Sequence, residues 1–281
     1  MDKKVVLSIA AHGDDAEFKA GGTLARLADE GHDVYLVIAT DNDRGSLRMS
    51  AGELRAAAER EAEGSAAALG ARGVFLLGYT DGDLCDARPS RLRGQLMHLI
   101  RQLKADVIFS WDPFAPFEDH PDHRAVAWAT SDAAAFAHFP LYHAEHLAEG
   151  LEPHRVSEWY WYSKANWRTN KLVDTTDTIE RKLQALYAYS SQMVLTVDEF
   201  LGEARAAGVD EARLAGIDPT QFEPLIEVGV RAADARTGAK LGCAYAEAFR
   251  YVCLEPPEIL AEIPEIPGVA ENPRDLESDP C

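Results

Sequence analysis

Short apolar runs rich in β-branched residues alternate with helix-like segments along the first 155 residues. The apolar runs are Val5–Ala10, Val34–Ala39, Val74–Leu77 and Val107–Ser110. The segments between them are residues 16–30, 53–69 and 91–103. Apolar spacing or an Ala-, Glu- and Arg-rich composition marks these segments as helices, and strands that alternate with helices at this spacing indicate βαβ units. We therefore predict a Rossmann-like α/β fold, with a mostly parallel sheet covered by helices on both faces.

The pattern loosens after residue 155, although no linker divides the chain. We expect a strand at 158–163, helices at 177–192 and 197–208, and a helix end followed by a strand at 244–255. This favours one domain over residues 1–255, with a core at 1–155 and a looser part at 156–255. Residues 256–281 are proline-rich and acidic, and we expect this tail to be poorly ordered or to lie along a neighbour.

The composition excludes several classes of partner. The chain has 281 residues and a formal net charge of −19, so its surface repels nucleic-acid phosphates and anionic membranes. Its four cysteines include no C-x-x-C pair, which indicates reduced thiols rather than a disulfide framework. The first apolar run is too short to span a membrane and lacks a signal-peptide cleavage pattern. We therefore expect a cytoplasmic protein.

Histidine and aspartate residues follow two of the predicted strands, at the point where each strand ends. His12, Gly13, Asp14 and Asp15 come directly after the first run, and the stretch "EDHPDHR" at 118–124 follows the fourth. Ligands of an open parallel sheet bind beyond the carboxyl ends of its strands, so both clusters should share one active-site edge. Two histidines and a carboxylate are a common ligand set for a catalytic zinc ion.

These motifs carry a family resemblance. The stretch "AAHGDDAEFKAGGTLARL" resembles the A-H-P-D-D-x-E…G-G-T-L signature of the PIG-L/LmbE-like zinc-dependent N-acetylglucosamine deacetylases, and "HPDHRAV" resembles their second signature. The stretches "ATDNDRGS", "GYTDGDL" and "IERKLQALYAYSSQ" are similar to later family segments. The resemblance covers roughly residues 4–195.

The resemblance implies one zinc ion per chain, held by His12, Asp15 and His123. It implies that Asp14 is the general base for the attacking water. His120 would stabilise the oxyanion or protonate the leaving amine. The implied reaction removes the N-acetyl group from an N-acetylglucosamine-type sugar or conjugate and gives acetate and a free amine.

Further site residues are expected around this centre. Asp122 is placed to orient His120 and to raise its pKa. Arg44 follows the second strand and could hold a substrate hydroxyl or carboxylate, and Arg124 adjoins the second histidine motif. Tyr189 stands where many family members have a histidine and is a candidate for substrate contact.

Two other departures from the family pattern occur beside the motifs. Gly13 replaces the common proline of the first signature, and we expect no loss of zinc binding from this change. Glu118 stands where some members place a tyrosine near the carbonyl group. These differences affect the identity of the substrate more than the reaction.

Two alternatives remain at this point. The first is a metal-dependent phosphoesterase, but phosphate sites recruit several cations, and only Arg44 and Arg124 are near. The second is a non-catalytic sugar-binding module with a metal, but structural zinc normally has four protein ligands, often cysteines. We expect a small amino-sugar substrate, no nucleic-acid or membrane partner, and assembly into a homo-oligomer.

Overall fold

The structure is a computed structural model and describes residues 2–254. The strands are β1 (Val5–Ala10), β2 (Asp33–Thr40), β3 (Gly73–Tyr79), β4 (Val107–Trp111), β5 (Glu158–Tyr162), β6 (Lys171–Asp174) and β7 (Ala246–Cys253). The helices are α1 (Asp15–Asp29), α2 (Ala51–Leu69), α3 (Pro89–Leu103), α4 (Pro121–Phe136), α5 (Glu145–Ala148), α6 (Ile179–Ala188), α7 (Ser190–Ala206), α8 (Glu211–Leu214) and α9 (Glu223–Leu241). The predicted tail at 256–281 lies outside the described residues.

One seven-stranded sheet organises the chain, in the order β3-β2-β1-β4-β5-β7-β6. The first five strands in this order are parallel, whereas β7 runs antiparallel to both β5 and β6. The chain moves outward from β1 to β3 and then returns to place β4 on the other side of β1. This reversal is the topological switch point at which α/β sheets bind ligands.

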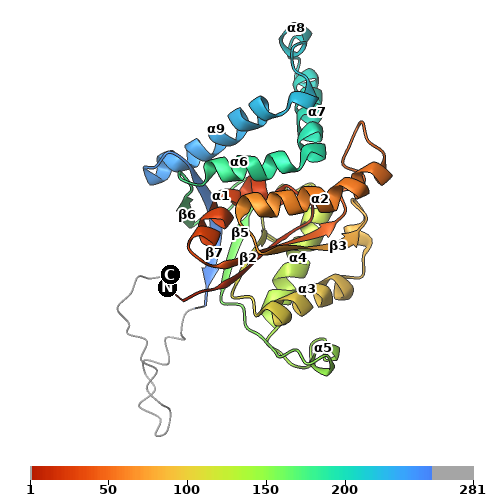
Figure 1. The fold of residues 1–281 in the computed structure, drawn as a ribbon, viewed down its shortest axis with the longest axis vertical. Coiled ribbons are helices and arrows are strands. Elements are labelled where there is room, and N and C mark those ends of the chain that lie inside the picture. Colours follow the sequence, from red (N-terminus) through yellow and green to blue (C-terminus); the bar gives the residue numbers. More distant parts are fainter. Residues whose placement is uncertain (1, 255–281) are drawn as a thin grey trace.

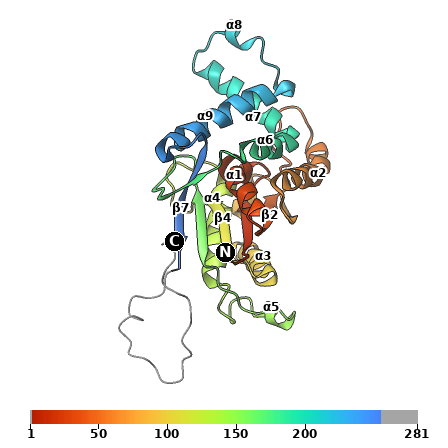
Figure 2. The same cartoon turned by 60° about the vertical axis from the view of Figure 1, so that its left-hand side comes forward.

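Helices cover both faces of the sheet, as predicted. Figure 1 shows α1, α2 and α6 on one face and α3 and α4 on the other. The turned view shows α7 and α8 beyond α6, whereas α9 also packs against the sheet at β7 (Figure 2). Within residues 2–254, no helix has both the length and the apolar character needed to cross a membrane.

The first half of the chain follows the predicted elements closely, and the second half departs from them. The helix predicted at 177–192 ends at Ala188, and a second helix, α7, runs from Ser190 to Ala206. In the described part of the segment 244–255, Ala246–Cys253 form the strand β7, and the preceding helix α9 already ends at Leu241. The prediction missed α9 and β6. The apolar pattern of α9 is diluted by glycines and by exposed Val228, so its sequence has little helical periodicity.

A buried ionic cluster joins this later part to the core. The ammonium of Lys182 on α6 contacts Asp234 of α9 at 2.7 Å and Glu247 of β7 at 2.8 Å. Glu247 also accepts hydrogen bonds from the backbone N–H groups of Gly22 and Thr23 on α1. One lysine thus balances two carboxylates, and four elements meet at its side chain. Burial, opposed only in part by Lys182, raises the pKa of Asp234 to about 6.

This pKa predicts a pH-dependent stability. Below about pH 4 both the folded and the unfolded chain hold the Asp234 proton, and between about pH 4 and pH 6 only the folded chain holds it. The stabilisation due to this proton is therefore lost as the pH rises through about 6. Relative to Asp234→Asn, the wild-type free energy of unfolding should fall by as much as ~2 kcal/mol over that interval. Urea unfolding of both proteins at pH 4.5 and 7 measures this difference, and parallel pH profiles would contradict it.

Candidate active site

The two predicted clusters lie side by side at the switch point. The loop after β1 carries His12 and Asp14, and α1 begins at Asp15. The loop after β4 leads to His120, which caps α4, so His123 lies in the first turn of that helix. Because β1 and β4 are paired in parallel, both loops leave the same edge of the sheet. The expectation that the strand ends gather these residues is confirmed.

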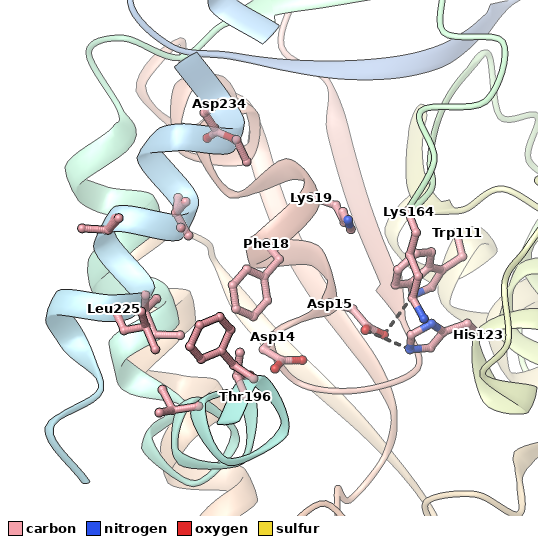
Figure 3. Close-up of a pocket in the computed structure, with 17 residues that line it drawn as sticks. Asp14, Asp15, Phe18, Lys19, Trp111, His123, Lys164, Thr196, Leu225 and Asp234 are labelled. Carbon is pink, nitrogen blue, oxygen red and sulfur yellow. Dashed lines mark hydrogen bonds and ion pairs between the residues drawn. The ribbon is translucent and has the colours of Figure 1, made fainter. Parts of the chain in front are cut away.

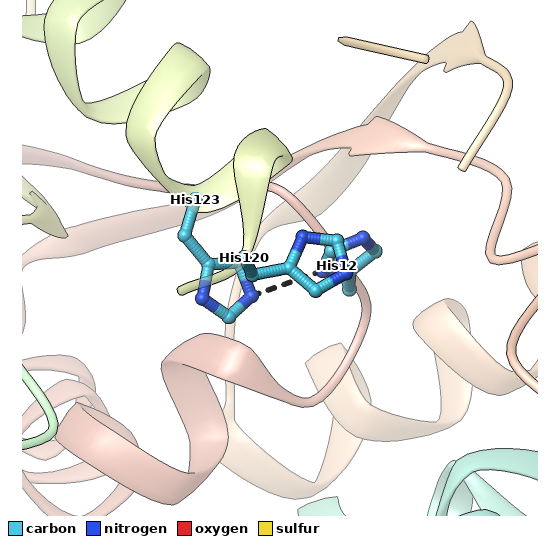
Figure 4. Close-up of side chains that lie close together, drawn as sticks. All are labelled: His12, His120 and His123. Carbon is cyan, nitrogen blue, oxygen red and sulfur yellow. Dashed lines mark hydrogen bonds between the residues drawn. The ribbon is translucent and has the colours of Figure 1, made fainter. Parts of the chain in front are cut away.

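Three donor atoms converge between the two loops. The His12 Nδ1 atom lies 3.2 Å from the His123 Nε2 atom, and the latter lies 3.1 Å from Asp15 Oδ1. The Asp15 Oδ2 atom is 3.7 Å from His12 Nδ1. Donors bound at about 2.0–2.1 Å in a tetrahedron are separated by roughly 3.3–3.4 Å. Figure 4 shows the hydrogen bond between the tilted His12 and His123 rings, with the His120 ring beside them.

The other nitrogen of each imidazole contacts a carboxylate. His12 Nε2 lies 3.0 Å from Asp81 Oδ1 and 3.4 Å from Asp122 Oδ2, while His123 Nδ1 lies 3.0 Å from Glu118 Oε1. In the neutral rings these contacts place the protons on His12 Nε2 and His123 Nδ1. The lone pairs of the two facing nitrogens and the Asp15 carboxylate then point into one small volume. Such an arrangement favours a positive charge between these groups, supplied by a proton or by a metal ion.

The pKa values of the cluster agree with this preference for a positive charge. Burial alone would lower the pKa of His12, but its contacts with Asp122, Asp15 and Asp81 raise that pKa well above the usual value. Burial likewise opposes protonation of His123, yet mainly Asp15 raises the pKa of His123 to about 9. Asp15 is also buried, and the two histidines hold its pKa well below the usual range. A divalent metal would supply the positive charge that these carboxylates favour.

His120 offers another nitrogen near this position. One donor atom from each of His12, His120 and His123 lies within 4.8 Å of the others, as do atoms of His12, Asp81 and Asp122. The His120 Nδ1 atom accepts the backbone N–H of Asp122 at 3.2 Å, however, and Asp81 and Asp122 contact the outer nitrogen of His12. The set His12, Asp15 and His123 therefore fits a metal best.

Asp14 has a strained backbone and faces the open side of the cluster. Its φ of 110° lies in the left-handed region, which residues other than glycine seldom adopt. Its side chain makes no capping hydrogen bond with α1. Burial, followed by the charge of Asp15, raises the pKa of Asp14 well above its usual value. The strain thus directs an uncommitted carboxylate beside the donor atoms rather than into the helix cap.

Asp122 has only part of the expected relation to His120. Its carboxylate is fully buried and accepts the N–H groups of Gly82 and Leu84, while it also approaches His12. Burial, followed by the charges of His12 and His123, lowers the pKa of His120. Asp122 raises the pKa of His120, as expected, but burial and the charges of His12 and His123 outweigh it, so the pKa does not rise above its ordinary value.

The two predicted arginines are occupied outside the cavity. Arg44 makes a bidentate pair with exposed Asp83, with both distances at 2.7 Å. Arg124 donates to the backbone carbonyls of Glu118 and Asp119 and so holds the turn that carries Glu118. Neither arginine lines the cavity described below.

Tyr189 also lies outside this cavity and packs behind the first motif. The residue is 2% exposed, and a Cβ atom on Gly13 would lie only 2.4 Å from its ring. The glycine at position 13 therefore makes room for this aromatic ring. Gly13 and Tyr189, two of the departures from the family pattern, are therefore in contact with each other.

A cavity of about 730 Å³ opens from the cluster. Asp14, Asp15, His123 and Trp111 form one end, whereas α7 and α9 form the far wall (Figure 3). The apolar residues of the cavity include Phe18, Val197, Phe200, Leu225, Ile226, Val228 and Val230. The polar residues other than those at the cluster end are Lys19, Lys164, Thr196 and Asp234.

Residues that support the cluster were assigned no role from the sequence. Asp81 and Glu118 contact the outer nitrogens of the histidines, and the indole N–H of Trp111 donates to Asp15 Oδ2 at 3.0 Å. Asp81 follows β3 and Trp111 ends β4, so the same strand-end rule points to both. Glu118 belongs to the 118–124 cluster that follows β4, but its contact with His123 depends on the fold of that loop.

The fold and the site define an α/β protein with a metal-type donor cluster at its switch point. The family model described as "PIG-L: GlcNAc-PI de-N-acetylase" matches residues 7–134. Diacetylchitobiose deacetylase of Thermococcus kodakarensis is 33% identical over 195 residues, which are 68% of this chain and 71% of the relative. The crystallised N,N'-diacetylchitobiose deacetylase from Pyrococcus horikoshii, in complex with an inhibitor, gives a TM-score of 0.74 at 30% identity and covers 90% of this chain and 85% of that one.

A third relative is named for a different substrate. The 1D-myo-inositol 2-acetamido-2-deoxy-α-D-glucopyranoside deacetylase of Rhodococcus erythropolis is 30% identical over 186 residues, 56% of this chain and 60% of the relative. The chain belongs to the PIG-L family of N-acetylglucosamine de-N-acetylases. The family and the fold inferred from the sequence motifs are thereby confirmed.

The contact between Glu118 and His123 predicts an effect on metal affinity. Glu118→Gln removes the charge that holds the His123 Nδ1 proton, so zinc affinity should fall by about 10–100-fold, the usual range for such supporting carboxylates. Competition with a chromophoric chelator measures the change. Asp119→Asn is the matched control, because Asp119 is adjacent and exposed and contacts no histidine of the cluster. Equal affinities of Glu118→Gln and the control would remove Glu118 from this role.

Proposed function

We propose that the chain is a zinc-dependent hydrolase that removes the acetyl group from the N-acetylglucosamine unit of a small glycoconjugate. Family membership supports the reaction class. The single observation that carries the zinc assignment is the approach of three side chains: His12 Nδ1 lies 3.2 Å from His123 Nε2, Asp15 Oδ1 lies 3.1 Å from His123 Nε2, and Asp15 Oδ2 lies 3.7 Å from His12 Nδ1. Two nitrogens and one oxygen are typical protein ligands of a catalytic zinc, which leaves a position for water or substrate.

We assign one zinc ion per chain to His12, Asp15 and His123. Bound there, zinc would polarise an amide carbonyl and lower the pKa of water from about 15.7 towards 7. Asp81, Asp122 and Glu118 keep the two imidazoles in the required tautomers. These carboxylates also offset the positive charge in a buried site.

Asp14 is the proposed general base. Its carboxylate lines the cavity beside the donor atoms and makes no capping hydrogen bond. Its oxygens are therefore not occupied by the backbone N–H groups of α1. A cation at the adjacent ligands opposes the rise in its pKa, so the carboxylate ionises when the metal is present. Asp14 then accepts the proton of the attacking water.

His120 is the proposed hydrogen-bond donor to the carbonyl oxygen. Its Nδ1 atom accepts a backbone N–H, so the neutral ring has its proton on Nε2. Burial, followed by the charges of His12 and His123, keeps the pKa of His120 low, which favours this neutral form. The leaving amine would take the proton that Asp14 accepts from water, unless His120 is protonated in the complex. Asp122 is a proposed positioning residue, because its carboxylate contacts His12 and holds the backbone of the 82–84 turn.

We assign no substrate contact to Arg44, Arg124 or Tyr189, since the first two have other partners and Tyr189 lies outside the cavity. The relatives support a substrate class of N-acetylglucosamine glycosides, because one acts on diacetylchitobiose and another on an inositol glycoside. The homo-oligomeric state and the cytoplasmic location remain predictions from the sequence.

The test of the proposal is Asp14→Asn, which removes the base and keeps the ligands. Zinc content should stay at the wild-type level, and acetate release from N-acetylglucosamine glycosides should fall by about 10²–10⁴-fold. Elemental analysis and an acetate assay measure the two quantities. Asp86→Asn, at an exposed position outside the cavity, is the control and should change neither.

Three outcomes would contradict the proposal. Near-normal turnover by Asp14→Asn would exclude its role as the base. Release of phosphate from phosphomonoesters, without acetate from any acetamide, would favour the phosphoesterase. Tight binding of zinc and sugar with no product of either kind would favour the binding module.

A further inference from the structure

A second pocket, of about 360 Å³, adjoins the catalytic cavity. The two share Phe18, Lys19, Lys164, Ala233 and Asp234, so they are continuous past these side chains. The smaller pocket extends along α9 towards β7. Its cationic lining residues are Lys19, Lys164, Arg236 and Lys240.

The carboxylates in and beside this pocket already have cationic partners. Asp234 and Glu247 both bind the ammonium of buried Lys182, and Glu247 also accepts the hydroxyl and backbone N–H of Thr23. Lys164 pairs with Glu118 and Asp119. Each of the two lysines is thus shared by two carboxylates, and none of these carboxylates forms an ion pair with Lys19, Arg236 or Lys240.

The other cationic side chains that line the pocket lack such partners. Within residues 2–254, Lys19, Arg236 and Lys240 form no ion pair with a carboxylate. Arg236 and Lys240 are exposed, where water solvates a cation, whereas Lys19 is shielded from solvent, so the missing partner matters most for Lys19.

Lys19 is at the junction of the two spaces. It projects from α1 above Asp15, on the side of Lys164 and Trp111 (Figure 3), and its ammonium lies 6.0 Å from the centre of the Trp111 ring. Burial, followed by repulsion from Lys182, lowers the pKa of Lys19. A buried ammonium beside other lysines is costly unless a negative group accompanies it. A bound anion would supply that group.

We propose that Lys19, with Arg236 and Lys240 farther along the pocket, binds an acidic group of the substrate, either a carboxylate or a phosphate. This inference rests on the proposed deacetylase function and narrows its substrate to acidic N-acetylglucosamine conjugates. The acetamide lies at the cluster, and the acidic substituent enters the second pocket past Lys19. A neutral glycoside leaves Lys19 without a partner and binds more weakly.

Three matched probes test the inference: the methyl, carboxymethyl and 1-phosphate derivatives of N-acetylglucosamine. The kcat/KM for acetate release should be about ten-fold or more higher for a charged probe than for the methyl glycoside, the ratio expected for one hydrogen bond to a charged group. Added salt should reduce this ratio. The carboxymethyl and phosphate arms show which acidic group the pocket prefers.

Lys19→Met preserves the length of the side chain and removes its charge. The preference for the charged probes should be lost, because kcat/KM should fall by about ten-fold or more further for the charged probes than for the methyl glycoside. Lys104→Met removes an exposed lysine outside both pockets and should keep the preference. Equal losses on charged and neutral probes in Lys19→Met would instead place Lys19 at the reacting acetyl group and overturn the proposal. A wild-type enzyme with no preference would also overturn it.

A binding measurement separates this inference from the proposed function. Titration calorimetry of the carboxymethyl derivative, with wild type and Lys19→Met, requires no turnover. Weaker binding to the variant without acetate release by either protein would reject the deacetylase and keep the anion pocket. Acetate release by both, with equal binding of the charged probe, would keep the deacetylase and reject the anion pocket.

Discussion

The carboxylate of Asp15 connects the two halves of the site. Its Oδ2 atom accepts the backbone N–H groups of Ala11 and His12 and the indole N–H of Trp111, whereas its Oδ1 atom faces His123. One side chain thereby fixes the turn after β1, the end of β4 and the first turn of α4. The three N–H donors also stabilise the ionised form in a buried place. The separation of the two histidine nitrogens depends on this arrangement.

A site with so many buried charges is stable only if each charge has a partner. Asp81, Asp122 and Glu118 each contact an imidazole, and Asp122 is further held by two backbone N–H groups. The same requirement is met at Lys182, which has two carboxylate partners. Buried ions of this kind contribute position more than stability. Their positions here determine which lone pairs face the centre and which face away.

The sequence predicted those parts of the molecule that have regular periodicity. The strands from β1 to β5 and their helices follow from apolar runs, and the strand-end rule then places His12 and His123 at one edge. The prediction failed where long-range packing decides. Arg44 pairs with Asp83, from a segment 39 residues away in the chain, and Tyr189 fills the space beside Gly13. No local pattern reveals such partners, nor the loop that brings Glu118 to His123.

The residues proposed for the reaction and the residues that line the substrate cavity also differ in how well the sequence predicts them. The proposed reacting groups lie on the ends of β1 and β4, within the residues 7–134 matched by the family model. Most of the cavity wall comes from α7 and α9, which lie beyond that match and have weaker sequence signals. Lys19 is an exception, because it belongs to the first motif segment yet lines both the cavity and the second pocket. Because its charge lies between the reacting cluster and the second pocket, it connects the shared chemistry of the family to the specificity of this chain.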